Sequence, residues 1–243
     1  MNIKLIALDM DGTLLNMEGT ISDVNRELIA QALDKGVYVV LSTGRWLESC
    51  YPYAESLKLD SYLVTCNGGE IWTVDKKLIE RHLLAPDRVN MMWDLCRGLD
   101  VNTWLVSTDN IWYGNRRPDN FSDHEWLKLG CDSHDTEKLD EIVKELSYYD
   151  DLELTNSLPT NIEINPKGVS KASALERVCE ELGITMQQVL AAGDSLNDIK
   201  MIQAAGVGVA MGNAQDAIKQ AADYVTETNE QDGVGKAIEK FVL

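Results

Sequence analysis

The chain has 243 residues, of which 44% are hydrophobic and 26% charged, as expected for a soluble globular protein with a sizeable core. Its formal net charge of −18 argues against a nucleic-acid partner, because phosphate backbones are bound by clustered Lys and Arg. No apolar run approaches the roughly 20 residues that cross a bilayer, and residues 1–10 lack the pattern of a secretory signal. We therefore expect a cytoplasmic protein without a membrane partner.

The cysteines and histidines indicate neither disulfides nor a zinc site. The cysteine count is odd and contains no C-x-x-C pair, and the three histidines form no H-E-x-x-H motif. We expect reduced and mostly buried thiols at five positions: Cys50, Cys66, Cys96, Cys131 and Cys179.

The N-terminal third of the chain alternates apolar runs with helical patterns. Ser22 is a potential helix cap, and Gly36 is a potential stop for the same helix. Such alternation is typical of parallel strands covered by helices. The predicted elements are strands at 3–8, 37–41 and 62–65 and helices at about 22–36 and 46–57.

A segment of different character lies between about residues 83 and 163. Its strand-like runs pair as hairpins, which is typical of a small antiparallel α+β domain. The predicted hairpins join 102–107 to 110–114 and 152–156 to 160–165, and the predicted helices cover 86–97 and 135–148. Five aromatic side chains concentrate here, and we expect them to form the core of this small domain more than the lining of a lid: Trp104, Trp112, Tyr113, Phe121 and Trp126.

The alternation of strands and helices resumes after this segment and continues to the C-terminus. The predicted elements are helix 170–182, strand 188–192, helix 196–205, strand 207–210, helix 214–222, strand 224–226 and helix 233–241. We predict a doubly wound, Rossmann-like α/β core formed by residues 1–82 and 164–243, with a cap domain of residues 83–163 inserted into it.

Two aspartates follow the first predicted strand directly, in Asp9-Met10-Asp11-Gly12-Thr13. Ligands of parallel sheets bind beyond the carboxyl ends of the strands, so both carboxylates should lie at the mouth of the sheet. Two carboxylates this close repel each other unless a cation neutralises them, and Mg²⁺ prefers carboxylate and phosphate oxygens. The alternative interpretation is a solvated turn at the end of a strand.

A second acidic motif, Gly193-Asp194-Ser195-Leu196-Asn197-Asp198, follows the predicted strand 188–192. Asp194 can complete a metal site there, and Asp198 lies one helical turn further on, where it can face the same way. The alternative is a helix N-cap formed by Asp194 or Ser195 alone.

Two further motifs predict an anion site. Thr43 and Gly44 lie at the start of the helix that follows strand 37–41, where a hydroxyl and backbone N–H groups can bind an anion. Lys171 lies at another predicted helix start, where its charge opposes the helix dipole and is better explained by a bound anion. A surface lysine and an ordinary strand–helix turn are the alternatives.

The motifs D-M-D-G-T-L-L, V-V-L-S-T-G-R, G-V-S-K-A-S-A-L and G-D-S-L-N-D-I-K-M-I, in this order, resemble the four motifs of the haloacid dehalogenase superfamily. The resemblance is to its Cof-type branch, whose further signatures are similar to Asn67-Gly68-Gly69 and Asp232-Gly233-Val234. The inserted segment lies where that branch carries a C2-type cap, but it looks shorter, as if a strand–helix unit were absent near 127–136.

The resemblance implies a role for each motif. Asp9 would be a nucleophile that forms an aspartyl-phosphate, and Asp11 would act as general acid and base. Mg²⁺ would be held by Asp9, the main-chain carbonyl of Asp11 and Asp194, with Asp198 orienting a metal-bound water. The phosphate oxygens would be held by the N–H groups of Met10 and Gly44 and by the side chains of Thr43, Lys171 and Asn197.

We therefore expect a Mg²⁺-dependent phosphatase of a small phosphorylated metabolite, such as a sugar phosphate, nucleotide or phosphorylated cofactor. A phosphomutase on the same scaffold and a non-catalytic receiver-like module with a phosphorylated aspartate are the alternatives. Arg116 and Arg117, in the cap loop 114–118, are candidates for contacting an anionic substrate, although a solvated loop is the simpler interpretation.

Overall fold

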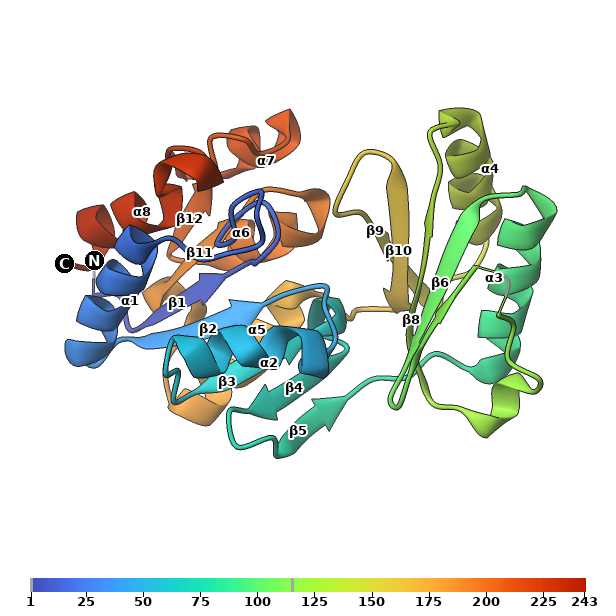
Figure 1. Ribbon diagram of the computed structural model, residues 1–243, viewed down its shortest axis with the longest axis horizontal. Coiled ribbons are helices and arrows are strands. Elements are labelled where there is room, and N and C mark those ends of the chain that lie inside the picture. The colour runs from blue at the N-terminus through green and yellow to red at the C-terminus, as the bar shows by residue number, and fades with distance from the viewer. Residues whose placement is uncertain (1, 115) are drawn as a thin grey trace. The chain divides into compact units, whose positions relative to one another are not determined.

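The computed structural model describes residues 2–114 and 116–243, which form two compact units (Figure 1). The first unit is discontinuous in sequence and consists of Met1–Glu80 and Ser170–Leu243, and the second consists of Arg81–Val169. The sequence placed the second junction earlier, between residues 163 and 164. The chain leaves the second unit later because β10 (Asn161–Pro166) belongs to the sheet of that unit.

The first unit contains a sheet of eight strands in the order β13-β12-β11-β1-β2-β3-β4-β5. The six strands from β13 to β3 are parallel, and β4 runs antiparallel to β3. The strands are β1 (Leu5–Leu8), β2 (Tyr38–Ser42), β3 (Tyr62–Thr65), β4 (Glu70–Thr73), β5 (Leu78–Arg81), β11 (Val189–Gly193), β12 (Val207–Ala210) and β13 (Tyr224–Val225).

Helices cover this sheet, as predicted for a doubly wound α/β core. One group contains α1, which packs against α8 and β2, and another contains α5, which packs against α6 and β3 (Figure 1). Ser22 caps α1 through the N–H of Asn25, and Gly183 ends α5 in the left-handed conformation. The helices are α1 (Asp23–Asp34), α2 (Leu47–Ser56), α5 (Lys171–Leu182), α6 (Ile199–Ala204), α7 (Asp216–Ala221) and α8 (Gly233–Phe241).

The central strand β1 determines where the carboxyl ends of the neighbouring strands meet. All four of its residues are buried, as expected for a strand with helices on both faces. Leu8 pairs with Leu41 on β2 and with Ala192 on β11. The segments that follow β1, β2 and β11 therefore start side by side at one edge of the sheet.

The second unit is an antiparallel sheet in the order β7-β6-β8-β10-β9. Its helices α3 (Pro86–Gly98) and α4 (Thr136–Leu146) pack on each other and on the sheet (Figure 1). The two predicted hairpins are present as β6 (Asn102–Ser107) with β7 (Ile111–Tyr113) and β9 (Leu152–Thr155) with β10. Phe121 and Trp126 lie in the core of this unit, as expected, whereas Tyr113 is exposed.

Near 127–136, where the sequence suggests that a strand–helix unit of the branch is absent, the chain forms β8 (Trp126–Asp132), which was not predicted and lies between β6 and β10. Its lysine, Lys128, is buried and donates a hydrogen bond of 2.7 Å to Glu163 on β10. The strands β4 and β5 were also not predicted. Other expectations agree with the structure, since all five cysteines are buried thiols. Among the helices of the described residues, none is long and apolar enough to cross a membrane.

Candidate active site

The candidate catalytic and metal-binding residues lie at the carboxyl ends of the three central strands of the first unit. Asp9 directly follows β1, Thr43 directly follows β2, and Asp194 directly follows β11. Because these strands are neighbours in register, the three residues start from the same edge of the sheet. Side chains that are far apart in sequence are thereby brought together where ligands of parallel sheets bind.

Lys171 is the fourth component and joins two of the acids. It is the first residue of α5, directly after the cap Ser170, whose side chain and that of Ser173 form a capping box. Its ammonium group donates to Asp9 Oδ1 and to Asp198 Oδ1, each at 2.6 Å. The Lys171 side chain is 0% exposed, so the charge is fully removed from water. Burial opposes its charged form, but Asp198 and Asp9 outweigh burial and raise the pKa of Lys171 above its ordinary value.

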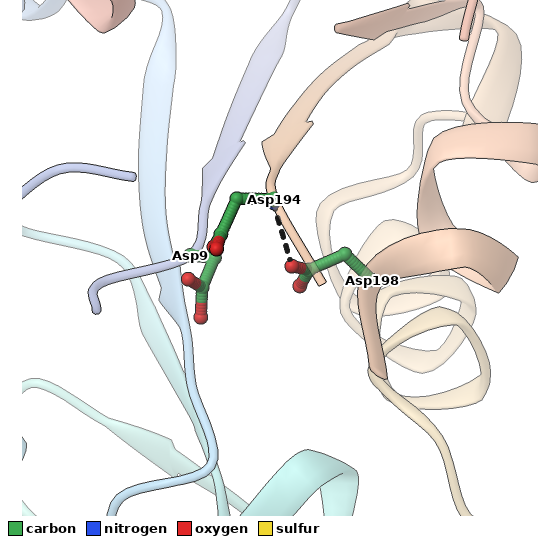
Figure 2. A group of neighbouring side chains, drawn as sticks. All are labelled: Asp9, Asp194 and Asp198. Carbon is green, nitrogen blue, oxygen red and sulfur yellow. Dashed lines mark hydrogen bonds between the residues drawn. The ribbon is translucent and has the colours of Figure 1, made fainter. Parts of the chain in front are cut away.

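Three carboxylates lie together at this edge of the sheet (Figure 2). One oxygen each of Asp9, Asp194 and Asp198 lies within 4.8 Å of the others. Asp198 Oδ2 accepts hydrogen bonds from the backbone N–H groups of Asp194 (3.0 Å) and Ser195 (3.1 Å). Asp194 in turn accepts from the hydroxyls of Thr13 (3.1 Å) and Ser195 (2.9 Å). These hydrogen bonds fix the directions of the carboxylates before any ligand arrives.

The electrostatics of this acidic group are unfavourable without a cation. Burial raises the pKa of Asp9 well above its ordinary value, and Asp198 and Asp194 raise it further, although Lys171 opposes them. Burial, with Asp198 adding, raises the pKa of Asp194 to about 6. When all three acids are ionised, three carboxylates and one ammonium leave two negative charges, which one divalent cation neutralises. The donors are all oxygens, the ligands that Mg²⁺ prefers, so the residues present fit this ion.

Two glycines let the carboxylates approach the backbone. A Cβ at Gly12 would lie 2.6 Å from Asp194 Oδ2, and Gly12 also has a φ of +79°. A Cβ at Gly193 would lie 2.4 Å from the carboxyl carbon of Asp198. Any larger residue at either position would push an acid out of the group.

Asp11 does not belong to the acidic group but is held by an arginine. Arg45 Nε donates to Asp11 Oδ2 at 2.8 Å, and Arg45 Nη2 donates to Asp11 Oδ1 at 2.6 Å. The guanidinium therefore binds both carboxylate oxygens in a bidentate pair. This pair raises the pKa of Arg45 above its ordinary value, chiefly through the hydrogen bonds to Asp11.

A second chain of contacts runs from Thr43 to Asn197 through the segment after β3. Thr43 Oγ1 accepts from the N–H of Arg45 (3.1 Å), and the Thr43 carbonyl accepts from the N–H of Asn67 (2.9 Å). Asn67 Oδ1 then accepts from Asn197 Nδ2 at 3.2 Å. Cys66 and Asn67 both have a positive φ, of 51° and 60°, which is a strained conformation for residues with a side chain.

The comparisons with known proteins agree on one family. The family model of haloacid dehalogenase-like hydrolases matches residues 6–128 and 117–238. The chain belongs to the haloacid dehalogenase-like hydrolases. It is 56% identical over 242 residues to the 5-amino-6-(5-phospho-D-ribitylamino)uracil phosphatase YcsE of Bacillus subtilis (strain 168), with 100% of this chain and 97% of that protein covered.

Two further relatives cover the whole length of this haloacid dehalogenase-like hydrolase. A second 5-amino-6-(5-phospho-D-ribitylamino)uracil phosphatase of Bacillus subtilis (strain 168), YwtE, is 31% identical over 286 residues and covers 99% of this chain and 98% of its own. The solved structure of a haloacid dehalogenase-like hydrolase from B. subtilis has a TM-score of 0.91 at 28% identity, covering 99% and 100% of the two chains. These findings confirm the resemblance of the motifs, and this hydrolase is a phosphatase of small phosphorylated compounds.

The structure of this hydrolase brings together most of the residues that the motifs singled out. Asp9, Lys171, Asp194 and Asp198 share direct contacts, and Asn197 joins them through its neighbour in the chain. Met10 is buried beside Asp9, and Gly44 follows Thr43. In the cap, Arg116 and Arg117 are both exposed, and Arg117 also donates to Asn90 (2.5 Å) on α3 and lies over the ring of Phe121.

Three residues that contribute to the site had no role assigned from the sequence: Arg45, Asn67 and Thr13. Arg45 is part of the V-V-L-S-T-G-R motif, but its partner is 34 residues away. Asn67 belongs to a noted signature, and the glycines that follow it were the available signal of an unusual backbone. Thr13 lies within the D-x-D-G-T motif, and its hydroxyl contacts Asp194, 181 residues away.

Proposed function

We propose that this chain is a Mg²⁺-dependent phosphatase that hydrolyses 5-amino-6-(5-phospho-D-ribitylamino)uracil through an aspartyl-phosphate at Asp9. The observation that carries the proposal is the position of Lys171, which bridges Asp9 and Asp198 in a fully buried site. A lysine that neutralises one oxygen of Asp9 leaves the carboxylate fixed at the mouth of the sheet, as a nucleophile requires.

In the first step, a carboxylate oxygen of Asp9 attacks phosphorus, and the bond between phosphorus and the ester oxygen breaks. The leaving oxygen takes a proton from Asp11 and departs as an alcohol. In the second step, Asp11 takes a proton from water, the water oxygen attacks phosphorus, and inorganic phosphate and the Asp9 carboxylate are released. The two steps use one protein carboxylate as nucleophile and the other as proton carrier, and they consume one water.

Mg²⁺ would be held by Asp9, the main-chain carbonyl of Asp11 and Asp194, with Asp198 behind them. When bound, it supplies positive charge that offsets the carboxylates and polarises the phosphoryl group. The buried acids with a raised pKa support this assignment, because their repulsion is what a cation at this place relieves.

The phosphate oxygens would be held by groups at the ends of β1 and β2 and at the starts of helices. Lys171 and Thr43 supply an ammonium and a hydroxyl, and Asn197 supplies the second hydrogen of an amide nitrogen whose first is bound to Asn67. The N–H groups of Met10 and Gly44 complete the proposed set. Fixed donors of this kind favour the charge that develops in phosphoryl transfer.

The similarity to two relatives of the same printed activity supports the proposed substrate, and one of them is 56% identical over the whole chain. By its name this substrate is an ester of phosphate with a primary alcohol of a ribityl chain. An alkoxide is a poor leaving group, so its departure depends on a proton donor. The placement of a second acid, Asp11, two residues from Asp9 suits such a substrate.

The test is the release of inorganic phosphate from 5-amino-6-(5-phospho-D-ribitylamino)uracil by the purified protein. We expect turnover with Mg²⁺, none after thorough chelation with EDTA, recovery on adding Mg²⁺ back, and none in the Asp9→Asn variant. Retention of most activity in Asp9→Asn would contradict the nucleophile, and unchanged turnover after chelation would contradict the metal. Formation of an isomer without phosphate release would instead indicate a phosphomutase.

The cap arginines remain candidates for substrate recognition. Because Arg117 is already engaged by Asn90 and by the ring of Phe121, Arg116 is the better candidate of the two. We expect Arg116→Ala to raise KM for the ribityl substrate and to leave KM for p-nitrophenyl phosphate unchanged. Equal KM values in the variant and the parent for both substrates would favour a solvated loop.

A further inference from the structure

Arg45 is a charged side chain that contacts Asp11 and that the proposed steps do not use. Its guanidinium binds both oxygens of Asp11, at 2.8 and 2.6 Å, although the Asp11 side chain is 58% exposed. An exposed carboxylate on a loop ordinarily samples several rotamers in water. Here it is tied instead to one partner with the planar fork geometry that fits a carboxylate.

Arg45 can hold Asp11 in place because it is itself fixed. The N–H of Arg45 donates to Thr43 Oγ1 (3.1 Å), and its carbonyl accepts from the N–H of Cys66 (2.8 Å). Its guanidinium lies 5.3 Å from the centre of the Tyr53 ring, and its side chain is only 26% exposed. The arginine is therefore anchored through its backbone and packed through its side chain before it reaches Asp11.

The pair separates Asp11 from the acids with which it would otherwise compete. The group of carboxylates suited to a cation consists of Asp9, Asp194 and Asp198 and does not include Asp11, which is only two residues from Asp9. Both oxygens of Asp11 are bound by Arg45, and its side chain lies outside that group. A misplacement of about 1 Å can cost on the order of 10²-fold in rate, so fixing this carboxylate has a large effect.

We propose that Arg45 is the positioning residue for Asp11: it orients this carboxylate toward the leaving oxygen and keeps it out of the cation site. The inference rests on the proposed function, in which Asp11 exchanges the proton of the leaving group. One arm of the guanidinium fork retains one oxygen of Asp11 while the other oxygen exchanges the proton. Arg45 acts through Asp11 and takes no part in bond breaking itself.

This role predicts that the effect of replacing Arg45 on kcat/KM depends on the leaving group of the substrate. A p-nitrophenolate departs without a proton, whereas the alkoxide of ribitol requires one. General acid catalysis typically contributes 10²- to 10⁴-fold. In Arg45→Met we therefore expect kcat/KM for 5-amino-6-(5-phospho-D-ribitylamino)uracil to fall at least about 10- to 100-fold. For p-nitrophenyl phosphate we expect kcat/KM to change by less than about 3-fold, because kcat/KM reports the first step, in which this leaving group departs without a proton.

The experiment measures both substrates, with saturating Mg²⁺, in the parent, Arg45→Met, Arg45→Lys and Arg177→Met. Arg177 is the matched control, since it pairs with Glu180 and Glu181 on the surface of α5. A lysine retains one donor but not the fork, so Arg45→Lys should lose an intermediate part of the alkyl-phosphate rate. A series of aryl phosphates should show a steeper dependence of kcat/KM on leaving-group pKa in Arg45→Met.

Two results would overturn the inference. Equal losses on both substrates would indicate that Arg45 only supports the structure, and unchanged alkyl-phosphate turnover in a folded Arg45→Met protein would indicate that Asp11 is oriented without it. If Arg45→Met does not fold, Arg45→Lys gives the same comparison. A parent protein that releases phosphate from neither substrate would refute the proposed function as well, whereas normal parent turnover confines a failure to Arg45.

Discussion

The Asp194→Asn variant should be more stable than the parent protein in the absence of divalent cations, and only at neutral or higher pH. In the parent, burial and the neighbouring Asp198 raise the pKa of Asp194 from 3.8 to about 6. A carboxyl whose pKa is raised in the folded state stabilises the native protein, and its contribution to the free energy of unfolding is fully present below about pH 4. This contribution is lost as the pH rises through about 6, because the folded state must then ionise a buried acid.

The size of the effect follows from this pKa. A rise from 3.8 to about 6 corresponds to about 3 kcal/mol in the free energy of unfolding, all of it lost above about pH 7. For a chain of this length, about 3 kcal/mol corresponds to roughly 6–12 °C in Tm. Asparagine keeps the shape of the side chain and can still pair with the hydroxyls of Thr13 and Ser195, but it carries no charge.

The assay is thermal unfolding of both proteins in EDTA between pH 5 and 8. About half of the 3 kcal/mol is already lost at pH 5, so we expect the Tm difference, variant minus parent, to grow by roughly 3–6 °C over this range. Adding Mg²⁺ at pH 8 should raise the Tm of the parent and leave that of Asp194→Asn nearly unchanged. A Tm difference that does not depend on pH, or an equal response of both proteins to Mg²⁺, would refute the reasoning that this carboxylate is strained until a cation neutralises it.

Three further substitutions test other parts of the site. Lys171→Met should abolish turnover and destabilise the protein by about 3–5 kcal/mol in chemical denaturation, because two buried carboxylates lose their partner; a loss below about 1 kcal/mol would contradict the pairing. Gly12→Ala should lose both activity and stabilisation by Mg²⁺. Gly19→Ala is the control and should keep both, because Gly19 has a similar φ of +72° but no atom within 4 Å of the added Cβ. Equal behaviour of the two variants would show that backbone strain alone matters. Asn67→Gly should weaken inhibition by inorganic phosphate about 5- to 10-fold without lowering Tm, because the amide is lost but glycine adopts the positive φ without strain. Asn67→Ala should weaken the inhibition and also lower Tm. Unchanged inhibition in both variants would contradict the role of this amide.

The sequence predicts the core of the fold because its strands are buried on both faces. The run that becomes β1 is apolar and buried at every position, and its neighbours β2 and β11 are buried at every position except Tyr38. Such runs have no alternation, but their order with helices between them leaves few arrangements other than a parallel sheet. The helix ends were also readable, since Ser22, Ser170 and Gly183 are residues with strong preferences for those positions.

The strand β8 could not be predicted for a physical reason. It carries a buried lysine, Lys128, in the middle of the cap sheet, which a periodicity argument treats as a solvent-exposed position. The lysine is compatible with burial because Glu163, 35 residues later on the neighbouring strand β10, accepts a hydrogen bond from it. Such pairing becomes visible only once the register of the strands is known.

The site shows the same division between local and long-range information. Asp9, Asp194 and Thr43 were predicted because each directly follows a buried strand, and a parallel sheet brings such positions together. Lys171 was predicted from its conflict with a helix dipole. The contact of Arg45 with Asp11 and the left-handed backbone of Asn67 depend on how separate loops meet, which no local pattern encodes.

The most direct test of the central claim is to trap the phosphoryl group on Asp9. The Asp11→Asn variant should be mixed with ³²P-labelled p-nitrophenyl phosphate and Mg²⁺, quenched in acid and digested, because this substrate needs no proton for the first step while the second step lacks its base. We predict hydroxylamine-sensitive label on the peptide that contains Asp9, and none in the Asp9→Asn protein. Release of p-nitrophenolate at one equivalent or more with no label on that peptide, or label on another residue, would contradict a covalent intermediate at Asp9.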